Sequence, residues 1–98
     1  YLVSTLQKRK ELMYKKSDAF IALPGGIGTI DEVFEVIATN ILTKSNKLLI
    51  LLNYKKFWRK LIDLLNTNIK QRYSKKKIKD NIRITTSVSK IFTILDNE

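Results

Sequence analysis

The chain has 98 residues and a formal net charge of +10, with 19 Lys and Arg against 9 Asp and Glu. A chain of this length forms at most one small domain. The absence of Cys excludes disulfides and thiolate metal sites, and the absence of His removes the usual general base and the commonest metal ligand. Acid–base chemistry would therefore depend on carboxylates, Lys or Tyr.

The first predicted element is a helix that begins near Ser4 or Thr5 and runs to about Lys16, because Ser and Thr are good N-caps. Arg9 and Lys10 lie in the middle of this helix, so a rigid element would hold both cations. From residue type alone they are typical of a solvated, lysine-rich helix surface.

A strand and a glycine turn follow this helix. The apolar run 19–23 predicts a strand buried on both faces, as in the centre of a parallel sheet. Pro24 cannot continue a central ladder, so the turn lies at the carboxyl end of the strand, where open α/β sheets bind ligands. Gly25, Gly26 and Gly28 leave backbone N–H groups uncovered at the start of the next helix, which predicts an anion site.

The next helix is predicted from Ile30 to about Leu42, because its apolar residues are spaced i, i+3, i+4, i+7 and i+11. Thr29-x-x-Glu32 fits a capping box, with Thr29 as the N-cap and Glu32 at position N3. Spacing alone therefore indicates a structural role for Glu32, as a carboxylate that caps a helix.

The run 48–52 predicts a second buried strand, with Asn53 at the same ligand-binding edge of the sheet. Phe57 and Trp58 begin a long amphipathic helix that reaches about Ile69. We interpret this aromatic pair as a core or subunit contact rather than a platform for stacking bases.

The segment 82–85 alternates between apolar and polar residues and predicts an edge strand. Thr86 or Ser87 would cap a last helix. The predicted buried side of that helix carries Val88, Ile91, Phe92 and Leu95. Helices and strands thus alternate along the whole chain, which predicts an α/β fold with a doubly wound, Rossmann-like parallel sheet and helices on both faces.

The excess positive charge is concentrated in 55–60 and 70–79. We interpret both segments as solvated surface, and the alternative is a basic polyanion binder. No recognised nucleic-acid motif accompanies the charge, so a nucleic-acid partner is not predicted. The apolar runs 19–23 and 48–52 are too short to cross a bilayer, so we predict no membrane partner and a cytoplasmic setting.

The glycine turn belongs to a longer motif. Residues 24–32 read Pro-Gly-Gly-Ile-Gly-Thr-Ile-Asp-Glu and resemble the Pro-Gly-Gly-x-Gly-Thr-x-x-Glu signature of the LOG family of phosphoribohydrolases, which are often labelled lysine decarboxylases. Arg9-Lys10 resembles the Arg-Lys pair of that family and stands at the family's separation from the glycine motif. Two motifs in the right order and spacing are more specific than either alone.

The resemblance implies an enzyme that hydrolyses the N-glycosidic bond of a nucleoside 5′-monophosphate, either AMP or a cytokinin riboside monophosphate, to the free base and ribose 5-phosphate. It implies a homodimer, and neither a cofactor nor a metal. Arg9 and Glu32 would be the catalytic residues. The implied substrate-binding residues are Lys10, Gly25, Gly26, Ile27, Gly28 and Thr29.

In members of the family, roughly another half of the domain, with the first strands of the sheet, precedes these motifs. We therefore expect residues 1–98 to be the C-terminal half of a single LOG-like nucleotide-binding domain whose N-terminal half is absent. The chain has Ala38-Thr39-Asn40-Ile41 where relatives often have Thr-Trp-x-Gln, which leaves the base preference open. A nucleotide-binding module that does not cleave its ligand, and an inactive fragment, are the alternatives.

Overall fold

The computed structural model describes residues 6–97, and within them helices and strands alternate as predicted. The predicted start of the first helix, at Ser4 or Thr5, lies outside this range. The elements are α1 (Leu6–Lys16), β1 (Ala19–Ala22), α2 (Ile27–Leu42), β2 (Leu48–Leu52), α3 (Arg59–Lys70), β3 (Ile82–Thr85) and α4 (Val88–Asp96), with 3₁₀ turns at Tyr54–Lys56 and Lys76–Lys79.

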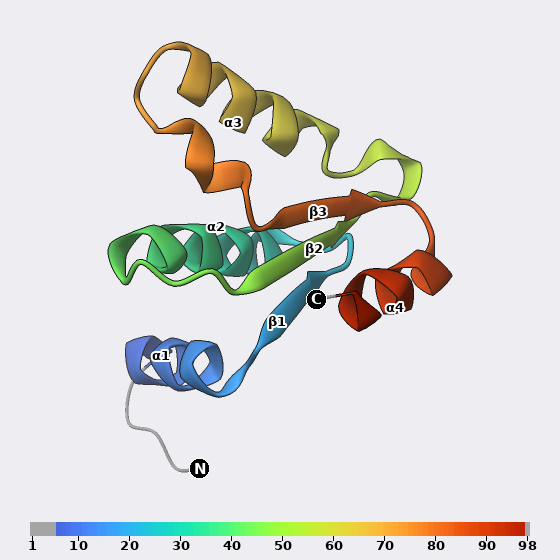
Figure 1. The fold of residues 1–98 in the computed structure, drawn as a ribbon, viewed down its shortest axis with the longest axis horizontal. Coiled ribbons are helices and arrows are strands. Elements are labelled where there is room, and N and C mark those ends of the chain that lie inside the picture. The colour runs from blue at the N-terminus through green and yellow to red at the C-terminus, as the bar shows by residue number, and fades with distance from the viewer. Residues whose placement is uncertain (1–5, 98) are drawn as a thin grey trace.

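The three strands form a parallel sheet in the order β1-β2-β3. Ala19 pairs with Leu48, and Leu49 pairs with Ile82. In Figure 1 the strands lie side by side, with α1 beyond β1 and α3 on the side of β3. The crossover helices α2 and α3 pack against one face of the sheet and α4 packs against the other, which confirms the α/β class with helices on both faces.

The core is centred on β2, all five residues of which are buried because β2 has a strand on each side and helices on both faces. The buried cluster on the face of α2 and α3 consists of Ala22, Val33, Val36, Ile37, Leu49, Leu51, Trp58 and Leu65. The buried cluster on the face of α4 consists of Leu48, Ile50, Leu52 and Ile91.

The prediction that the first strand is buried on both faces is wrong for the described chain. β1 is an edge strand, and Ile21 on its α4 side is 48% exposed. The predicted buried side of the last helix is also half wrong: Ile91 is buried, but Val88 and Phe92 are 58% and 63% exposed. Ile91 of α4 packs on β2 side chains, with Ala19 at the start of β1 beside them, and Ile21, Val88 and Phe92 lie outside this cluster.

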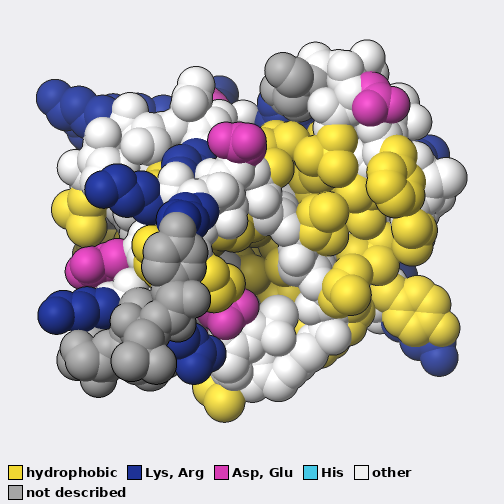
Figure 2. All heavy atoms as spheres, turned by 90° about the horizontal axis from the view of Figure 1, so that it is seen from below, with side chains coloured by type: hydrophobic (Ala, Val, Ile, Leu, Met, Phe, Trp, Pro, Cys, Tyr) yellow, Lys and Arg dark blue, Asp and Glu magenta, His cyan; other side chains and the backbone are white. Residues whose placement is uncertain are grey.

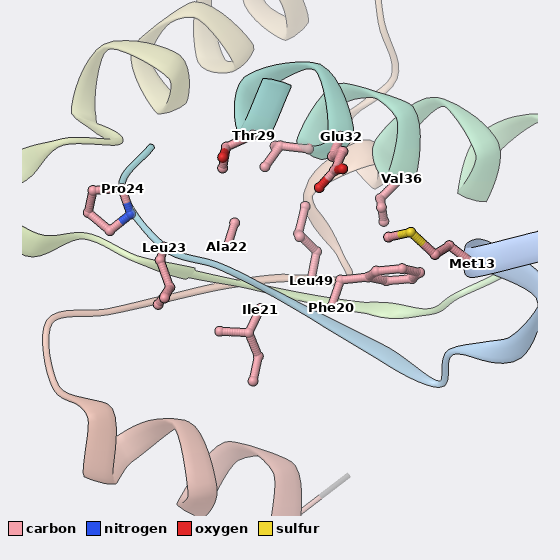
Figure 3. Close-up of a pocket in the computed structure, with 11 residues that line it drawn as sticks. Met13, Phe20, Ile21, Ala22, Leu23, Pro24, Thr29, Glu32, Val36 and Leu49 are labelled. Atoms are coloured by element: carbon pink, nitrogen blue, oxygen red, sulfur yellow. The ribbon is translucent and has the colours of Figure 1, made fainter. Parts of the chain in front are cut away.

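We use the name open apolar face for the exposed apolar side chains of β1, the turn after it and α4, which are Ile21, Leu23, Val88 and Phe92. Figure 3 shows Ile21 and Leu23 pointing away from α2, toward α4. Figure 2 shows hydrophobic side chains gathered into one continuous area on the side of α4, whereas charged side chains gather on the other side of the same view. Soluble monomeric proteins rarely expose a continuous apolar area of this kind. It is typical of a surface that another protein segment covers.

The predicted capping box is wrong. α2 begins at Ile27 rather than Ile30, with Gly26 as its N-cap, and the Ile30 N–H donates to the Gly26 carbonyl at 3.2 Å. Thr29 is therefore the third residue of the helix, and Glu32 lies one turn further in. The glycine that ends the turn starts the helix, so the Glu32 carboxylate is not needed to cap it.

A tight turn joins β2 to α3. Asn53 makes two hydrogen bonds that fix this turn. Its N–H donates to the carbonyl of Thr85 on β3 at 2.7 Å, and its side-chain Oδ1 accepts the Trp58 N–H at the far end of the turn at 2.7 Å. Lys55 and Lys56 lie within the turn with φ of 50° and 61°, in the left-handed region. This turn is the reason that α3 begins at Arg59 and not at the predicted Phe57.

Replacing Lys56 by Gly is expected to raise the free energy of unfolding by up to about 1 kcal/mol, because an L side chain at positive φ is strained and Gly is not. Urea denaturation measures the change. The matched control is Lys60→Gly within α3, which is expected to lower stability by about 1 kcal/mol because Gly weakens helices. A loss of stability in Lys56→Gly would contradict the assignment of strain to this turn.

Candidate active site

A cavity of about 450 Å³ lies at the carboxyl end of β1, between that strand, α1 and α2 (Figure 3). Its lining residues are Met13 from α1, Phe20, Ile21, Ala22, Leu23 and Pro24 from β1 and the turn, Thr29, Glu32, Val33 and Val36 from α2, and Leu49 from β2. Because the lining includes residues 20–22 of β1 and the two residues that follow, the cavity runs along the unpaired edge of that strand. Its volume is sufficient for a small-molecule ligand.

Thr29 and Glu32 are the hydroxyl and the carboxylate in this largely apolar wall. They are three residues apart on α2 and therefore share one helix face. Figure 3 shows the Glu32 carboxylate pointing from α2 toward the strand, with Thr29 one turn before it. The structure thus brings together two of the residues that the sequence motif singled out.

The three glycines of the turn have different roles. None has a positive φ. A Cβ atom at Gly25 would collide with Thr29 Oγ1 and lie 3.0 Å from Thr29 Cβ, whereas a Cβ at Gly26 or Gly28 would meet nothing within 4 Å. Only Gly25 is thus required by the packing of the turn. The space over Gly26 and Gly28 is open, beside first-turn N–H groups that lack intrahelical partners.

Replacing Gly28 by Ala is expected to raise the free energy of unfolding by up to about 1 kcal/mol, since Ala favours a helix over Gly. Replacing Gly25 by Ala is expected to lower it by about 1–3 kcal/mol, because Thr29 must move away from the new methyl group. Thermal or urea denaturation of the two variants measures both changes. Equal effects of the two substitutions would contradict the different roles assigned to these glycines.

The two predicted cations of α1 are placed differently from each other. Arg9 is exposed and is not among the residues that line the cavity, although Met13, one helical turn further along α1, is. Lys10 Nζ forms a hydrogen-bonded ion pair with the Asp31 carboxylate on α2. The structure therefore joins Lys10 to the helix that carries Glu32.

The ion pair persists at neutral pH. The hydrogen bond to Asp31 raises the pKa of Lys10, and the negative charges of Asp31, Glu35 and Glu32 add to this effect. Because the folded-state pKa is raised, the contribution of the pair to stability is present at neutral pH and is lost as the pH rises through that value, above the ordinary 10.5.

Asp31 and Met13 are among the residues near the site that sequence reasoning missed. Asp31 stands inside the glycine motif, but its partner is 21 residues away along the chain, and spacing does not reveal such a pair. Met13 could have been found, because it lies four residues after Arg9 and shares its helix face.

Within residues 6–97, no helix is long and apolar enough to cross a membrane. The same part of the chain contains no group of three or more acidic side chains placed to hold a metal ion.

Comparison with known proteins identifies the family. The family model described as "Possible lysine decarboxylase" matches residues 1–95. A probable cytokinin riboside 5′-monophosphate phosphoribohydrolase of Oryza sativa subsp. japonica is 35% identical over 96 residues, which is 98% of this chain and 37% of that protein. The chain belongs to the LOG family.

Other LOG-family relatives carry the same activity in their names. A cytokinin riboside 5′-monophosphate phosphoribohydrolase of Rhodococcoides fascians is 43% identical over 65 residues, 66% of this chain and 33% of that protein. One of Arabidopsis thaliana is 39% identical over 71 residues, 72% of this chain and 33% of that protein. The chain spans about a third of the length of these curated LOG-family relatives.

Proposed function

We propose that the protein to which this chain belongs hydrolyses the N-glycosidic bond of a nucleoside 5′-monophosphate. The observation that carries the proposal is the placement of Glu32 and Thr29 in a cavity at the carboxyl end of β1, beside an open helix N-terminus. The names of the LOG-family relatives support the reaction class.

The start of α2 would bind the 5′-phosphate. The N–H groups of its first turn and the positive end of the helix dipole favour an anion at this position. Gly26 and Gly28 leave room for the phosphate to approach the backbone, and Ile27 between them is 82% exposed, so its side chain points into solvent rather than into the turn. The Thr29 hydroxyl could donate a further hydrogen bond to the phosphate.

Glu32 would serve the bond that breaks. As the base departs, positive charge develops on the ribose, and a carboxylate beside the sugar stabilises this oxocarbenium-like state or orients the attacking water. The water oxygen bonds to C1′, the N-glycosidic bond breaks, and the base leaves with a proton, which yields free base and ribose 5-phosphate. Arg9 would then assist the phosphate or the leaving base, as a guanidinium suits either contact.

The apolar wall of the cavity, which includes Met13 of α1 and Phe20 of β1, suits a purine ring. We therefore propose an adenine nucleotide as the substrate, either AMP or its N6-modified cytokinin form. We propose that this cleavage takes place in the cytoplasm and requires neither a metal nor a cofactor.

We further propose that the chain is the C-terminal half of one LOG-like domain that works as a homodimer. The unpaired edge of β1 and the open apolar face support this, since an added strand and helix would cover Ile21 and Phe92. We expect the isolated 98-residue chain to self-associate through this face, because exposed strand edges and apolar areas associate.

Phe92→Lys tests the open apolar face. Since Phe92 is 63% exposed, the change should reduce self-association in analytical ultracentrifugation without lowering the free energy of unfolding. An isolated chain that stays monomeric at high concentration would contradict the proposal of an uncovered half-domain.

The proposed reaction is tested by incubating AMP and a cytokinin riboside 5′-monophosphate with the natural full-length protein and with the 98-residue chain. Release of free base by the full-length protein supports the proposal, and ribose 5-phosphate should appear in equal amount. Gly28→Ala should weaken substrate binding although it stabilises the helix, because its methyl group enters the open space over the turn.

The second candidate is a module that binds a nucleotide without cleaving it. It is favoured by the position of Arg9, which is exposed and outside the cavity. Equilibrium dialysis with AMP separates the two functions: retained AMP with no free base supports the module, and free base supports the hydrolase.

A further inference from the structure

We propose that Lys10 is a positioning residue: together with Tyr14 and Lys47 it docks the arginine-bearing helix α1 on α2, and it does not bind the phosphate. This inference rests on the proposed function for its catalytic consequence. The contacts that carry it are independent of that function.

The first contact is the ion pair between Lys10 on α1 and Asp31 on α2. The Lys10 side chain is 20% exposed and the Asp31 side chain is 55% exposed, so most of the Lys10 side chain is covered although the ion pair itself is open to solvent. Glu32 and Glu35 on the same helix add negative charge around it. To contact a phosphate at the start of α2, Lys10 would have to break its ion pair with Asp31.

The second contact lies at the other end of α1. The Tyr14 hydroxyl donates to Asn40 Oδ1 on α2, and Asn40 Nδ2 donates to the Lys47 carbonyl at 2.9 Å. Lys47 Nζ donates to the Tyr14 carbonyl and, at 3.3 Å, to the Lys15 carbonyl. A cation on the last carbonyls of a helix satisfies acceptors that have no intrahelical partner and complements the helix dipole.

Ring contacts strengthen this end. Lys47 Nζ lies 4.3 Å from the centroid of the Tyr14 ring, and the Tyr14 ring stacks on Phe20 of β1 with their centroids 5.7 Å apart. Tyr14 thus connects α1 to α2, to β1 and to the start of β2 at one point.

Lys10 and Tyr14 are one helical turn apart, so they lie on the same face of α1 and the two contacts fix its rotation as well as its position. Arg9 and Met13 are each displaced by one residue from this pair, and Met13 lines the cavity. The contacts therefore determine where Arg9 lies relative to Glu32. A small displacement of a reacting group is sufficient to slow catalysis strongly.

Amide hydrogen exchange of α1 tests the docking without any need for activity. Lys10→Met and Asp31→Asn are each expected to speed exchange in α1 by about two- to fivefold relative to wild type, as for the loss of a partly exposed ion pair. The double variant K10E/D31K should recover part of the protection that Lys10→Glu alone loses, because it re-forms the pair with reversed charges while Glu32 and Glu35 still repel a carboxylate at position 10. Lys15→Met, which removes an exposed cation from the same helix, is the matched control and should leave exchange unchanged.

Steady-state kinetics of the full-length protein test the consequence. Lys10→Met should lower kcat by about 10- to 100-fold while KM changes less than about twofold, and K10E/D31K should recover more activity than Lys10→Glu alone. A raised KM with unchanged kcat, not rescued by K10E/D31K, would show that Lys10 binds the phosphate and would overturn the inference. Unchanged α1 exchange in Lys10→Met would overturn it as well. Absence of base release by the wild type would contradict the proposed function alone, because the exchange experiment still decides the docking.

Discussion

Replacing Glu32 by Gln is expected to lower the rate of base release by about 10²- to 10⁴-fold, with little change in nucleotide affinity. Gln keeps the size and hydrogen-bonding capacity of the side chain but removes the negative charge that would stabilise the developing cation on the ribose. Because α2 begins at Ile27, with Gly26 as its N-cap, Glu32 has no capping role to lose. The variant should therefore fold as the wild type does.

The experiment measures free base from AMP with the full-length protein, and AMP binding by calorimetry with the same preparation. Glu35→Gln is the matched control, since Glu35 is one turn further along α2 and does not line the main cavity. A Glu32→Gln variant with wild-type turnover would remove Glu32 from the chemistry. Equal losses in Glu32→Gln and Glu35→Gln would indicate a general effect of charge on α2.

Replacing Trp58 by Ala is expected to lower the free energy of unfolding by about 3–5 kcal/mol, which is a large part of the stability of a small domain. Trp58 is 1% exposed and belongs to the buried cluster between the sheet and the helices α2 and α3. Its ring also meets that of Phe57 edge to face, with centroids 4.9 Å apart. Truncation would remove these contacts and leave a cavity.

Trp58→Phe should cost clearly less than Trp58→Ala. The Trp58 indole N–H is buried without a hydrogen-bond partner among the described residues, so its removal eliminates an unsatisfied donor. Urea denaturation of both variants measures the difference. Phe57→Ala serves as the control, because Phe57 is 41% exposed and should lose less stability than Trp58→Ala. A Trp58→Ala variant as stable as Phe57→Ala would show that the cluster is not the core.

Local sequence patterns predicted a helix or strand well where the apolar residues of that one segment determine it. The apolar run 48–52 became the central strand, and the i, i+3, i+4 spacing located α2. The start of α2 was mispredicted because Thr29-x-x-Glu32 satisfies a capping rule, while Gly26 starts the helix three residues earlier. The rule describes a possible cap, and the backbone path of the glycine turn selects the actual one.

The candidate site was predicted in part. The motif placed Thr29 and Glu32 at the carboxyl end of the first strand, and both line the cavity there. Arg9 is on the predicted helix but outside the cavity, and Lys10 is paired with Asp31. A motif indicates which residues matter, but the packing of α1 on α2 decides where their charged groups lie.

The sequence by itself determined the α/β alternation, the carboxyl-edge location of the glycine turn and the membership of the LOG family, because periodicity, glycine spacing and motif order are properties of short segments. Only the tertiary structure decided that β1 is an edge strand, that Val88 and Phe92 remain exposed, and that Lys10 pairs with Asp31. Burial and charge pairing depend on which distant segments meet in space. The type of an apolar or charged residue does not identify the segment that it contacts.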